Sequence, residues 1–407
     1  MNQSEVVLAG GTIAFNDTPG YSIDAINKTT DANITIGNKE PCVPAYLFAI
    51  PHNFVIFTIT ITIVLDTLIS VLGIAGNILS IVILSKEKHL TTSIYLLRAL
   101  AISDMSFLML VIFIDPMYAM YTTTHFVPQT AAWPNQMTSA LPYILPVIST
   151  SQTLTTWMVL LVTIDRFIQV CIPLSASRLC TLPRAKMAVV VTVGLSFMYN
   201  VPRFWEYVPN NVQFPCGTTV VLGYTAFGKN NYYTYIYQIC LNAIFRYMGP
   251  VLVLIILNGN LIIALKDAHR RRQQMTGNEK EAQNITFTLV IVATSFLLCI
   301  MPYNTVNVMV TLWNTNNAAK PDQLIMRYLL AVGNFLLKVN SSVNFLIYCL
   351  TGKRFRETFI SMCCPGFRRG QRYNAVNSKP PKELSDNSTV QTVVHSSTKG
   401  DTKMSLL

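Results

Sequence analysis

Long apolar stretches alternate with short polar segments along most of the chain, starting near Phe54. The apolar stretches are interrupted only by small residues or by single polar residues. A helix of about 20 apolar residues crosses a hydrocarbon core of roughly 30 Å. The pattern therefore predicts spans at about 56–84, 93–121, 142–168, 185–204, 234–265, 284–313 and 325–350.

Composition supports the same interpretation. Hydrophobic residues make up 51% of the 407 residues and charged residues only 12%, which leaves too little charge to cover a soluble surface. A cytosolic enzyme, a secreted disulfide scaffold and a disordered chain are thereby excluded. We expect an all-α membrane protein, a seven-transmembrane helix bundle over 55–350, with no enzymatic role.

Two features orient the predicted bundle. Residues 1–54 carry Asn-x-Ser/Thr triplets at Asn2, Asn16, Asn27 and Asn33, which predict an extracellular, glycosylated segment. No basic region precedes an apolar one there, so we expect the first span to direct insertion. Lys and Arg concentrate in the loops that should then be cytosolic. The net charge of +11 therefore reflects topology and anionic inner-leaflet lipid rather than nucleic acid, and the plasma membrane is the expected location.

The segment after the seventh span reads as an amphipathic helix on the inner leaflet, over 351–364, with Phe355, Phe359 and Ile360 on one face. Cys363 and Cys364 follow as palmitoylation sites, with unmodified thiols as the alternative. Residues 365–407 lack apolar periodicity and predict a disordered cytosolic tail, whose hydroxyls are phosphorylation candidates or simply solvated.

Polar side chains inside the predicted spans are costly, so each needs a partner or a function. They are Asp66, Asn77, Asp104, Asp115, Asp165, Arg166, Arg246, Asn258, Lys338, Asn340 and Asn344. Taken singly, many of them serve equally well as hydrogen-bonding contacts between helices.

Their order and spacing resemble the rhodopsin-like G-protein-coupled receptors between about Phe54 and Cys364. The motifs that carry the resemblance are Gly76-Asn77, Leu100-Ala101-Ile102-Ser103-Asp104, Asp165-Arg166-Phe167, Pro250, Phe296-Leu297-Leu298-Cys299-Ile300-Met301-Pro302 and Asn344-Phe345-Leu346-Ile347-Tyr348. Three further segments resemble FMRFamide-type neuropeptide receptors of invertebrates. These are Tyr199-Asn200-Val201-Pro202-Arg203-Phe204-Trp205-Glu206, Leu257-Asn258 and Asn340-Ser341-Ser342-Val343-Asn344-Phe345.

The chain departs from the general pattern of that superfamily at three positions. Phe167 replaces the usual Tyr, Ile300 stands where many members have a Trp, and Phe345 replaces the Pro of the seventh span. The fourth span also has no Trp. We therefore expect the activation rearrangement to differ in detail from that of better-known members.

The resemblance implies a switch at the cytosolic end, formed by Asp165, Arg166, Phe167, Asn344 and Tyr348. Asp165 is expected to hold Arg166 at rest, and helix motion to free Arg166 for a heterotrimeric G protein. Without the other motifs, a pair of charges reaching out of the membrane would be the simpler interpretation. A receptor kinase and an arrestin are the implied partners of the tail.

The resemblance also implies a sodium site, the only bound ion or cofactor expected. It places Thr155, Asn340, Ser341 and Asn344 around Asp104, and a carboxylate with neutral oxygens suits a small hard cation. A protonated Asp104 in a hydrogen-bonded network is the alternative.

The cysteines predict an unusual disulfide. Of nine cysteines, only Cys42 and Cys216 are expected outside, and the oxidising exterior favours their pairing. Members of the superfamily usually bridge the second outer loop to the third span, but no cysteine lies between His125 and Pro146.

The ligand is expected to be a peptide. Ile148 occupies the position where amine receptors of the superfamily carry an Asp, and aromatic residues crowd the outer ends of the spans, although interfacial aromatic belts explain part of that crowding. An Arg-Phe-amide end would need a carboxylate. The candidate pocket residues are Asp115, Tyr118, Trp205, Glu206 and Lys338.

Lys338 leaves other functions open. It matches the lysine that binds retinal in opsins, so an opsin photoreceptor is an alternative. The structural interpretation is an ion pair, because Asp66 and Asp115 should lie at similar depths. A transporter or channel is the remaining class, and the chain shows no inverted repeat that would favour it.

Overall fold

A computed structural model describes residues 7–8, 11–12, 51–87, 90–123, 133–214, 217–270, 277–315 and 323–363. The chain divides into two units, Met1–Phe359 and Ile360–Leu407, and all the long helices belong to the first. Several predicted features lie outside the described residues. They are the glycosylation triplets at Asn2, Asn16, Asn27 and Asn33, the cysteines Cys42, Cys216 and Cys364, and the tail beyond 364.

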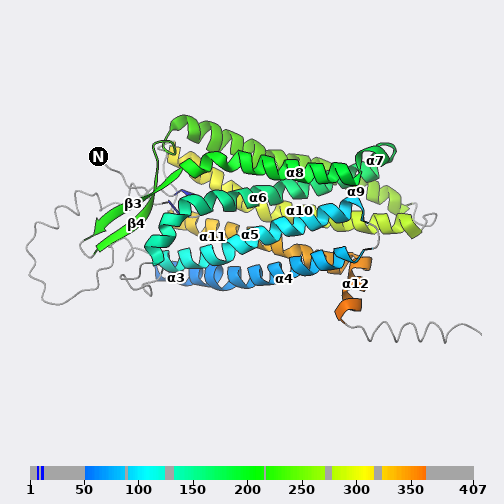
Figure 1. Ribbon diagram of the computed structural model, residues 1–407, viewed down its shortest axis with the longest axis horizontal. Coiled ribbons are helices and arrows are strands. Elements are labelled where there is room, and N and C mark those ends of the chain that lie inside the picture. Colours follow the sequence, from blue (N-terminus) through cyan, green and yellow to red (C-terminus); the bar gives the residue numbers. More distant parts are fainter. Residues whose placement is uncertain are drawn as a thin grey trace, which may run out of the picture. The chain divides into compact units, whose positions relative to one another are not determined.

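Long helices run alongside one another and form a bundle (Figure 1). Some of these long helices consist of consecutive helical segments. The segments are α3 (His52–Thr58), η1 (Ile59–Leu65), α4 (Asp66–Ser85), α5 (Thr92–Thr123), α6 (Trp133–Cys171), α8 (Leu182–Asn200), η2 (Val201–Trp205), η3 (Tyr233–Met248), α9 (Gly249–Arg270), α10 (Gly277–Thr315) and α11 (Gln323–Thr351). Within the described residues they make seven stretches long and apolar enough to cross a membrane. The predicted seven-helix bundle is confirmed.

Helix α6 starts well before the predicted span, at Trp133 rather than near 142. Pro142 and Pro146 lie inside it, which membrane helices tolerate when neighbouring groups satisfy the freed backbone. Its first turns are polar, and Thr138 Oγ1 donates to the Pro134 carbonyl over 2.9 Å. The apolar pattern missed these turns because they pack against a hairpin rather than against lipid.

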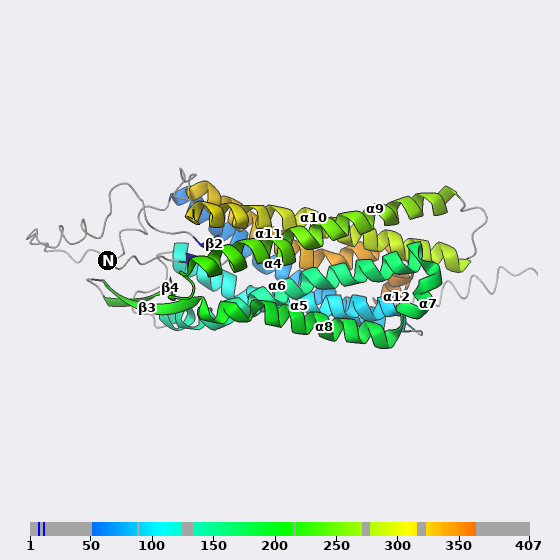
Figure 2. The same ribbon diagram turned by 90° about the horizontal axis from the view of Figure 1, so that it is seen from above.

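That hairpin pairs β3 (Tyr207–Phe214) with β4 (Gly217–Tyr224) in antiparallel register, Tyr207 opposite Tyr224. It projects from one end of the bundle, called the hairpin end below (Figures 1 and 2). Leu222 packs on Leu141 of α6, and the Val220 N–H donates to Asn135 Oδ1 over 3.0 Å. The hairpin thus covers the polar start of α6. Two short paired strands, β1 (Val7–Leu8) and β2 (Gly11–Thr12), lie earlier in the chain.

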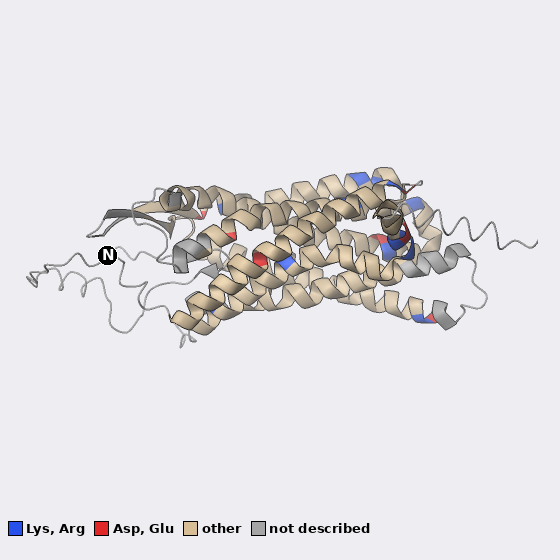
Figure 3. Cartoon of the chain, turned by 90° about the horizontal axis from the view of Figure 1, so that it is seen from below, with Lys and Arg blue, Asp and Glu red and all other residues tan. Residues whose placement is uncertain are grey.

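Lys and Arg gather at the opposite end of the bundle, called the Arg166 end below (Figure 3). The short helix α7 (Pro173–Leu179) lies there, between α6 and α8; the sequence predicted only a loop. Between the two ends, the helices carry only a few Lys, Arg, Asp or Glu residues (Figure 3). This distribution agrees with the charge asymmetry expected of membrane proteins.

Helices α4 and α11 approach closely where Gly76 faces Phe345. A Cβ atom on Gly76 would lie 2.9 Å from the Phe345 Cβ, so a larger residue would push the helices apart. Asn77 Nδ2 donates to the Ser341 carbonyl over 2.9 Å. Small residues and interhelical hydrogen bonds are the usual means of helix association in membranes, and here they position α11.

Helix α12 (Lys353–Cys363) follows α11 after a single residue. The Phe355 ring lies 5.5 Å from that of Tyr348 and 5.9 Å from that of Phe345, and the Phe359 ring lies 5.5 Å from Phe345. Phe355 is buried by these contacts, whereas Ile360 is 38% exposed. The predicted amphipathic helix is present, and Cys363 at its end is exposed.

Candidate functional site

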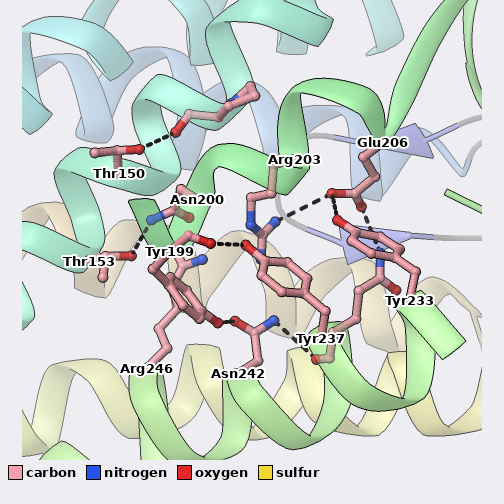
Figure 4. Close-up of polar contacts among 12 residues, drawn as sticks. Thr150, Thr153, Tyr199, Asn200, Arg203, Glu206, Tyr233, Tyr237, Asn242 and Arg246 are labelled. Atoms are coloured by element: carbon pink, nitrogen blue, oxygen red, sulfur yellow. Dashed lines mark hydrogen bonds and ion pairs between the residues drawn. The ribbon is translucent and has the colours of Figure 1, made fainter. Parts of the chain in front are cut away.

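Beneath the hairpin, η2 and η3 bring together a buried acid and a buried base (Figure 4). Glu206 Oε2 accepts from the Tyr233 hydroxyl over 2.9 Å and lies 3.8 Å from Arg203 Nη1. Its Oε1 accepts from Gln238 Nε2 over 2.8 Å. Glu206 is only 2% exposed. The expected pocket carboxylate is therefore already bound by groups of the protein itself.

Stacked tyrosines connect this pair to the middle of the bundle (Figure 4). The rings of Tyr233 and Tyr237 stack at 5.1 Å, those of Tyr237 and Tyr199 at 5.4 Å, and the Arg203 guanidinium lies 5.7 Å from the Tyr237 ring centre. The Tyr199 hydroxyl donates to Asn242 Oδ1 over 2.6 Å. The contact with the Tyr237 ring and the ion pair with Glu206 together hold Arg203 without full exposure to water. Trp205, by contrast, is 60% exposed.

Lys338 lies between two carboxylates on the other side of the bundle. Its Nζ is 2.6 Å from Asp66 Oδ2 and 2.7 Å from Asp115 Oδ2. The side chains of Lys338 and Asp66 are each 3% exposed, whereas that of Asp115 is 19% exposed. The expected ion pair is present and includes both candidate acids. Three formal charges sum to −1 here, and Asp115 is the group nearest to solvent.

Among the five expected pocket residues, the structure joins Asp115 and Lys338. Glu206 makes its contacts in the separate η2–η3 cluster, with Trp205 beside it in sequence. The side chain of Tyr118 lies outside the described residues. The residues that sequence reasoning missed are Tyr237, Gln238 and Asn242, and their only signal was the run of polar and aromatic residues over Tyr232–Asn242.

Asp104 lies fully buried in the core, 0% exposed. Its Oδ2 accepts from Asn344 Nδ2 over 2.7 Å, and Ser341 and Thr155 interact with the same carboxylate. Its Oδ1 has no hydrogen-bond donor in the described part of the chain. Asn340, one turn before Asn344, is also buried. A carboxylate oxygen left without a donor among neutral oxygens matches what a small cation would require.

At the Arg166 end, Asp165 and Arg166 interact electrostatically, and the expectation that Asp165 holds Arg166 at rest stays a prediction. Within the described residues no ion pair joins them, and Gln169 lies between. Gln169 Nε2 donates to Asp165 Oδ2 over 2.8 Å, and Arg166 Nη1 donates to Gln169 Oε1 over 3.2 Å. Asp165 also accepts from the Ser93 hydroxyl over 2.7 Å. Adjacent helical residues point about 100° apart, whereas Gln169, one turn later, reaches both.

The Cys180 thiol lies beside this group, with Sγ 3.8 Å from the Asp165 carbonyl oxygen. Burial, together with the negative charge of Asp165, raises the pKa of this thiol to about 11. The thiol is therefore neutral at physiological pH. Phe167 is half-buried next to Arg166, and Tyr348 is buried on α11.

Comparison with known proteins agrees with this architecture. The model of the seven-transmembrane receptors of the rhodopsin family matches residues 76–348. An FMRFamide receptor of Drosophila melanogaster is 33% identical over 303 residues, which are 73% of this chain and 52% of that protein. The chain thus spans about half the length of that relative.

Two other relatives complete the comparison. The FMRFamide peptide receptor frpr-18 of Caenorhabditis elegans is 26% identical over 78% of this chain and 73% of its own length. A blue-sensitive opsin of Anolis carolinensis is 26% identical over 52% of this chain and 56% of its own length. From the family match, the bundle and the buried polar residues, the chain belongs to the rhodopsin family of seven-transmembrane receptors.

Proposed function

We propose that this chain is a receptor for an extracellular neuropeptide with an amidated Arg-Phe end, and that it activates a heterotrimeric G protein. The similarity to the Drosophila FMRFamide receptor over 303 residues carries the proposal. In this assignment the protein is a multi-pass protein of the plasma membrane with its N-terminus outside. The hairpin end then faces the exterior and the basic Arg166 end faces the cytosol, as the positive-inside rule favours.

The peptide's arginine would meet Asp115. This carboxylate is partly exposed, and it shares Lys338 with Asp66, so the group keeps a net negative charge. A guanidinium binds a carboxylate through two parallel hydrogen bonds. Glu206 is the weaker candidate, because Tyr233, Gln238 and Arg203 already occupy it. Aromatic side chains of the peptide would lie against the exposed Trp205.

At the cytosolic end, activation would release Arg166 from Gln169 so that the guanidinium can contact the G protein. A charge-assisted hydrogen bond contributes about 1.5–3 kcal/mol, which is enough to bias two helix arrangements but not to lock one. The tail would then serve a receptor kinase and an arrestin. Helix α12 would lie on inner-leaflet lipid, held there by palmitoylation of Cys363 and Cys364.

A sodium ion is the proposed occupant of the Asp104 site in the resting state. Asp104, Thr155, Asn340, Ser341 and Asn344 would hold it. The support is the Asp104 oxygen that lacks a donor among the described residues. The ion would supply a positive charge there, and Asn344 Nδ2 would hold the other carboxylate oxygen in place.

A retinal-binding opsin is the second candidate, favoured by the position of Lys338 alone. The contacts of Lys338 oppose it, because a Schiff base needs an unprotonated amine and two carboxylates here stabilise the ammonium form. The opsin similarity also covers only 52% of the chain.

A panel of peptides and retinal would test the assignment. Cells expressing the chain should respond to Phe-Met-Arg-Phe-amide with G-protein activation and should not respond to its citrulline analogue. Purified protein incubated with retinal should give no visible absorption band. Light-dependent signalling with a retinal band would replace the peptide assignment by the opsin.

A further inference from the structure

Arg246 is a buried base for which the described residues supply no acidic partner. Arg246 lies inside η3 and is 5% exposed. Its one polar contact in the described part of the chain runs from Nη2 to Gln152 Oε1 of α6. Figure 4 shows Arg246 next to Asn242 and Tyr199, both neutral. A buried guanidinium is normally paired with an anion, since desolvating an unpaired charge costs several kcal/mol.

The carboxylates with printed contacts in the hairpin half of the bundle are engaged elsewhere. Glu206 contacts Tyr233, Gln238 and Arg203. Asp66 and Asp115 share Lys338. None of these acids lies within 4 Å of Arg246 among the described ion pairs, so no described carboxylate neutralises Arg246, which interacts only with polar and aromatic groups such as Tyr199 and Tyr303.

An independent observation comes from α10. Asn304 is 6% exposed, yet neither its Oδ1 nor its Nδ2 has a hydrogen-bond partner in the described part of the protein. Its sequence neighbour Tyr303 interacts electrostatically with Arg246, so this turn of α10 lies beside η3. A buried amide left wholly unsatisfied needs an explanation, and a bound polar group is the simplest one.

We propose that Arg246, oriented by Gln152 and assisted by Asn304, forms a subsite that binds a carboxylate of the ligand. The inference rests on the proposed peptide-receptor function and deepens it. The planar guanidinium matches a carboxylate in geometry as well as charge. The receptor then has a positive pole at Arg246 and a negative pole at Asp115, and it binds ligands that carry both charges more tightly than ligands that carry only the positive one. The carboxylate is either an acidic side chain or a free C-terminus.

Three peptides separate these sources. They are Asp-Phe-Met-Arg-Phe-amide, Asn-Phe-Met-Arg-Phe-amide and Asn-Phe-Met-Arg-Phe with a free C-terminal carboxylate. Arg246→Gln should lower the potency of the Asp peptide if the ligand carboxylate is a side chain, or that of the free-acid peptide if it is a C-terminus. The loss should be about tenfold or more, the scale of a charge-assisted hydrogen bond. The neutral amide peptide should change less than about threefold. Arg246→Lys keeps the positive charge but not the planar guanidinium. It should therefore retain part of the potency difference between the carboxylate-bearing peptides and the neutral amide peptide.

If no peptide activates the receptor, that result counts against the proposed function alone. The melting temperature of the purified protein then still tests the carboxylate subsite, because it needs no agonist. N-acetyl-aspartate should raise the melting temperature of purified wild type but not that of Arg246→Gln. N-acetyl-asparagine amide, which has no carboxylate, should raise neither. Equal potency loss for all three peptides, or no difference between the two small molecules, would overturn the carboxylate subsite and leave Arg246 as a packing residue.

Discussion

Lys338 and Asp66, 272 positions apart in the chain, meet in the bundle with Nζ 2.6 Å from Oδ2. The contact ties α11 to the start of α4. Asp115 of α5 shares the same ammonium at 2.7 Å, so three helices converge on one charge. Two acids on one base leave a formal negative charge in this group, of which Asp115 is the partly exposed member.

Lys338→Met should therefore reduce folding as well as signalling. It leaves the buried Asp66 and the partly exposed Asp115 without their base, and breaking a buried pair such as Lys338–Asp66 costs roughly 3–5 kcal/mol. Surface expression should fall, and the double variant Lys338→Met/Asp66→Asn should recover part of it. Lys266→Met, a change at an exposed position of α9, is the matched control. Failure of the double variant to exceed the single one would contradict an energetic coupling of these residues.

Gln169 should hold the receptor at rest. Gln169→Met removes the acceptor of Arg166 and the donor of Asp165, so basal G-protein signalling should rise. Gln169→Glu keeps an acceptor for Arg166 but loses the donor to Asp165, so its basal signalling should rise less than that of Gln169→Met. The measurement is agonist-free signalling normalised to surface receptor. If both variants behave like wild type, Gln169 has no part in the switch.

Sodium should weaken agonist binding through Asp104. In wild type, exchanging N-methylglucamine for sodium at constant ionic strength should lower agonist affinity, because the ion favours the resting state. Asp104→Asn should abolish that difference. A sodium effect that persists in Asp104→Asn would place the ion elsewhere, and its absence in wild type would favour the protonated network.

The Cys180 thiol should react slowly and with a strong pH dependence. Because its pKa is raised to about 11 and only the thiolate is nucleophilic, maleimide labelling should accelerate about tenfold per pH unit between pH 8 and 10. Peptide mapping after timed labelling of hydroxylamine-treated protein measures this, with the exposed Cys363 as an internal comparison. A rate that levels off below pH 9 would show an unperturbed thiol.

Most of the fold could be predicted because spans are determined by local apolarity. The predicted span 325–350 falls within α11, Gln323–Thr351. The start of helix α6 was not predicted, because its first turns, near Thr138, are polar and are covered by the β3–β4 hairpin. That covering is a tertiary contact, and no local pattern reports it.

The candidate site residues also divide into those whose position follows from the sequence and those whose contacts depend on tertiary packing. Lys338, Asp66 and Asp115 could be brought together by counting residues from the helix ends, since depth in a membrane helix follows position at 1.5 Å per residue. Asp165 and Arg166 could not, because their relation depends on which way adjacent side chains point and on Gln169 one turn away. Likewise, the engagement of Glu206 by Tyr233 and Gln238 depends on the turns of η3.

Nucleotide exchange on a purified G protein is the most direct test of receptor function. Receptor reconstituted in lipid nanodiscs should accelerate exchange when Phe-Met-Arg-Phe-amide is added, and Arg166→Ala should bind the same peptide without accelerating exchange. That result would connect peptide binding near Asp115 to G-protein activation at the Arg166 end. No acceleration by this or any other amidated peptide in a panel, with intact wild-type receptor, would contradict the account, as would undiminished exchange with Arg166→Ala.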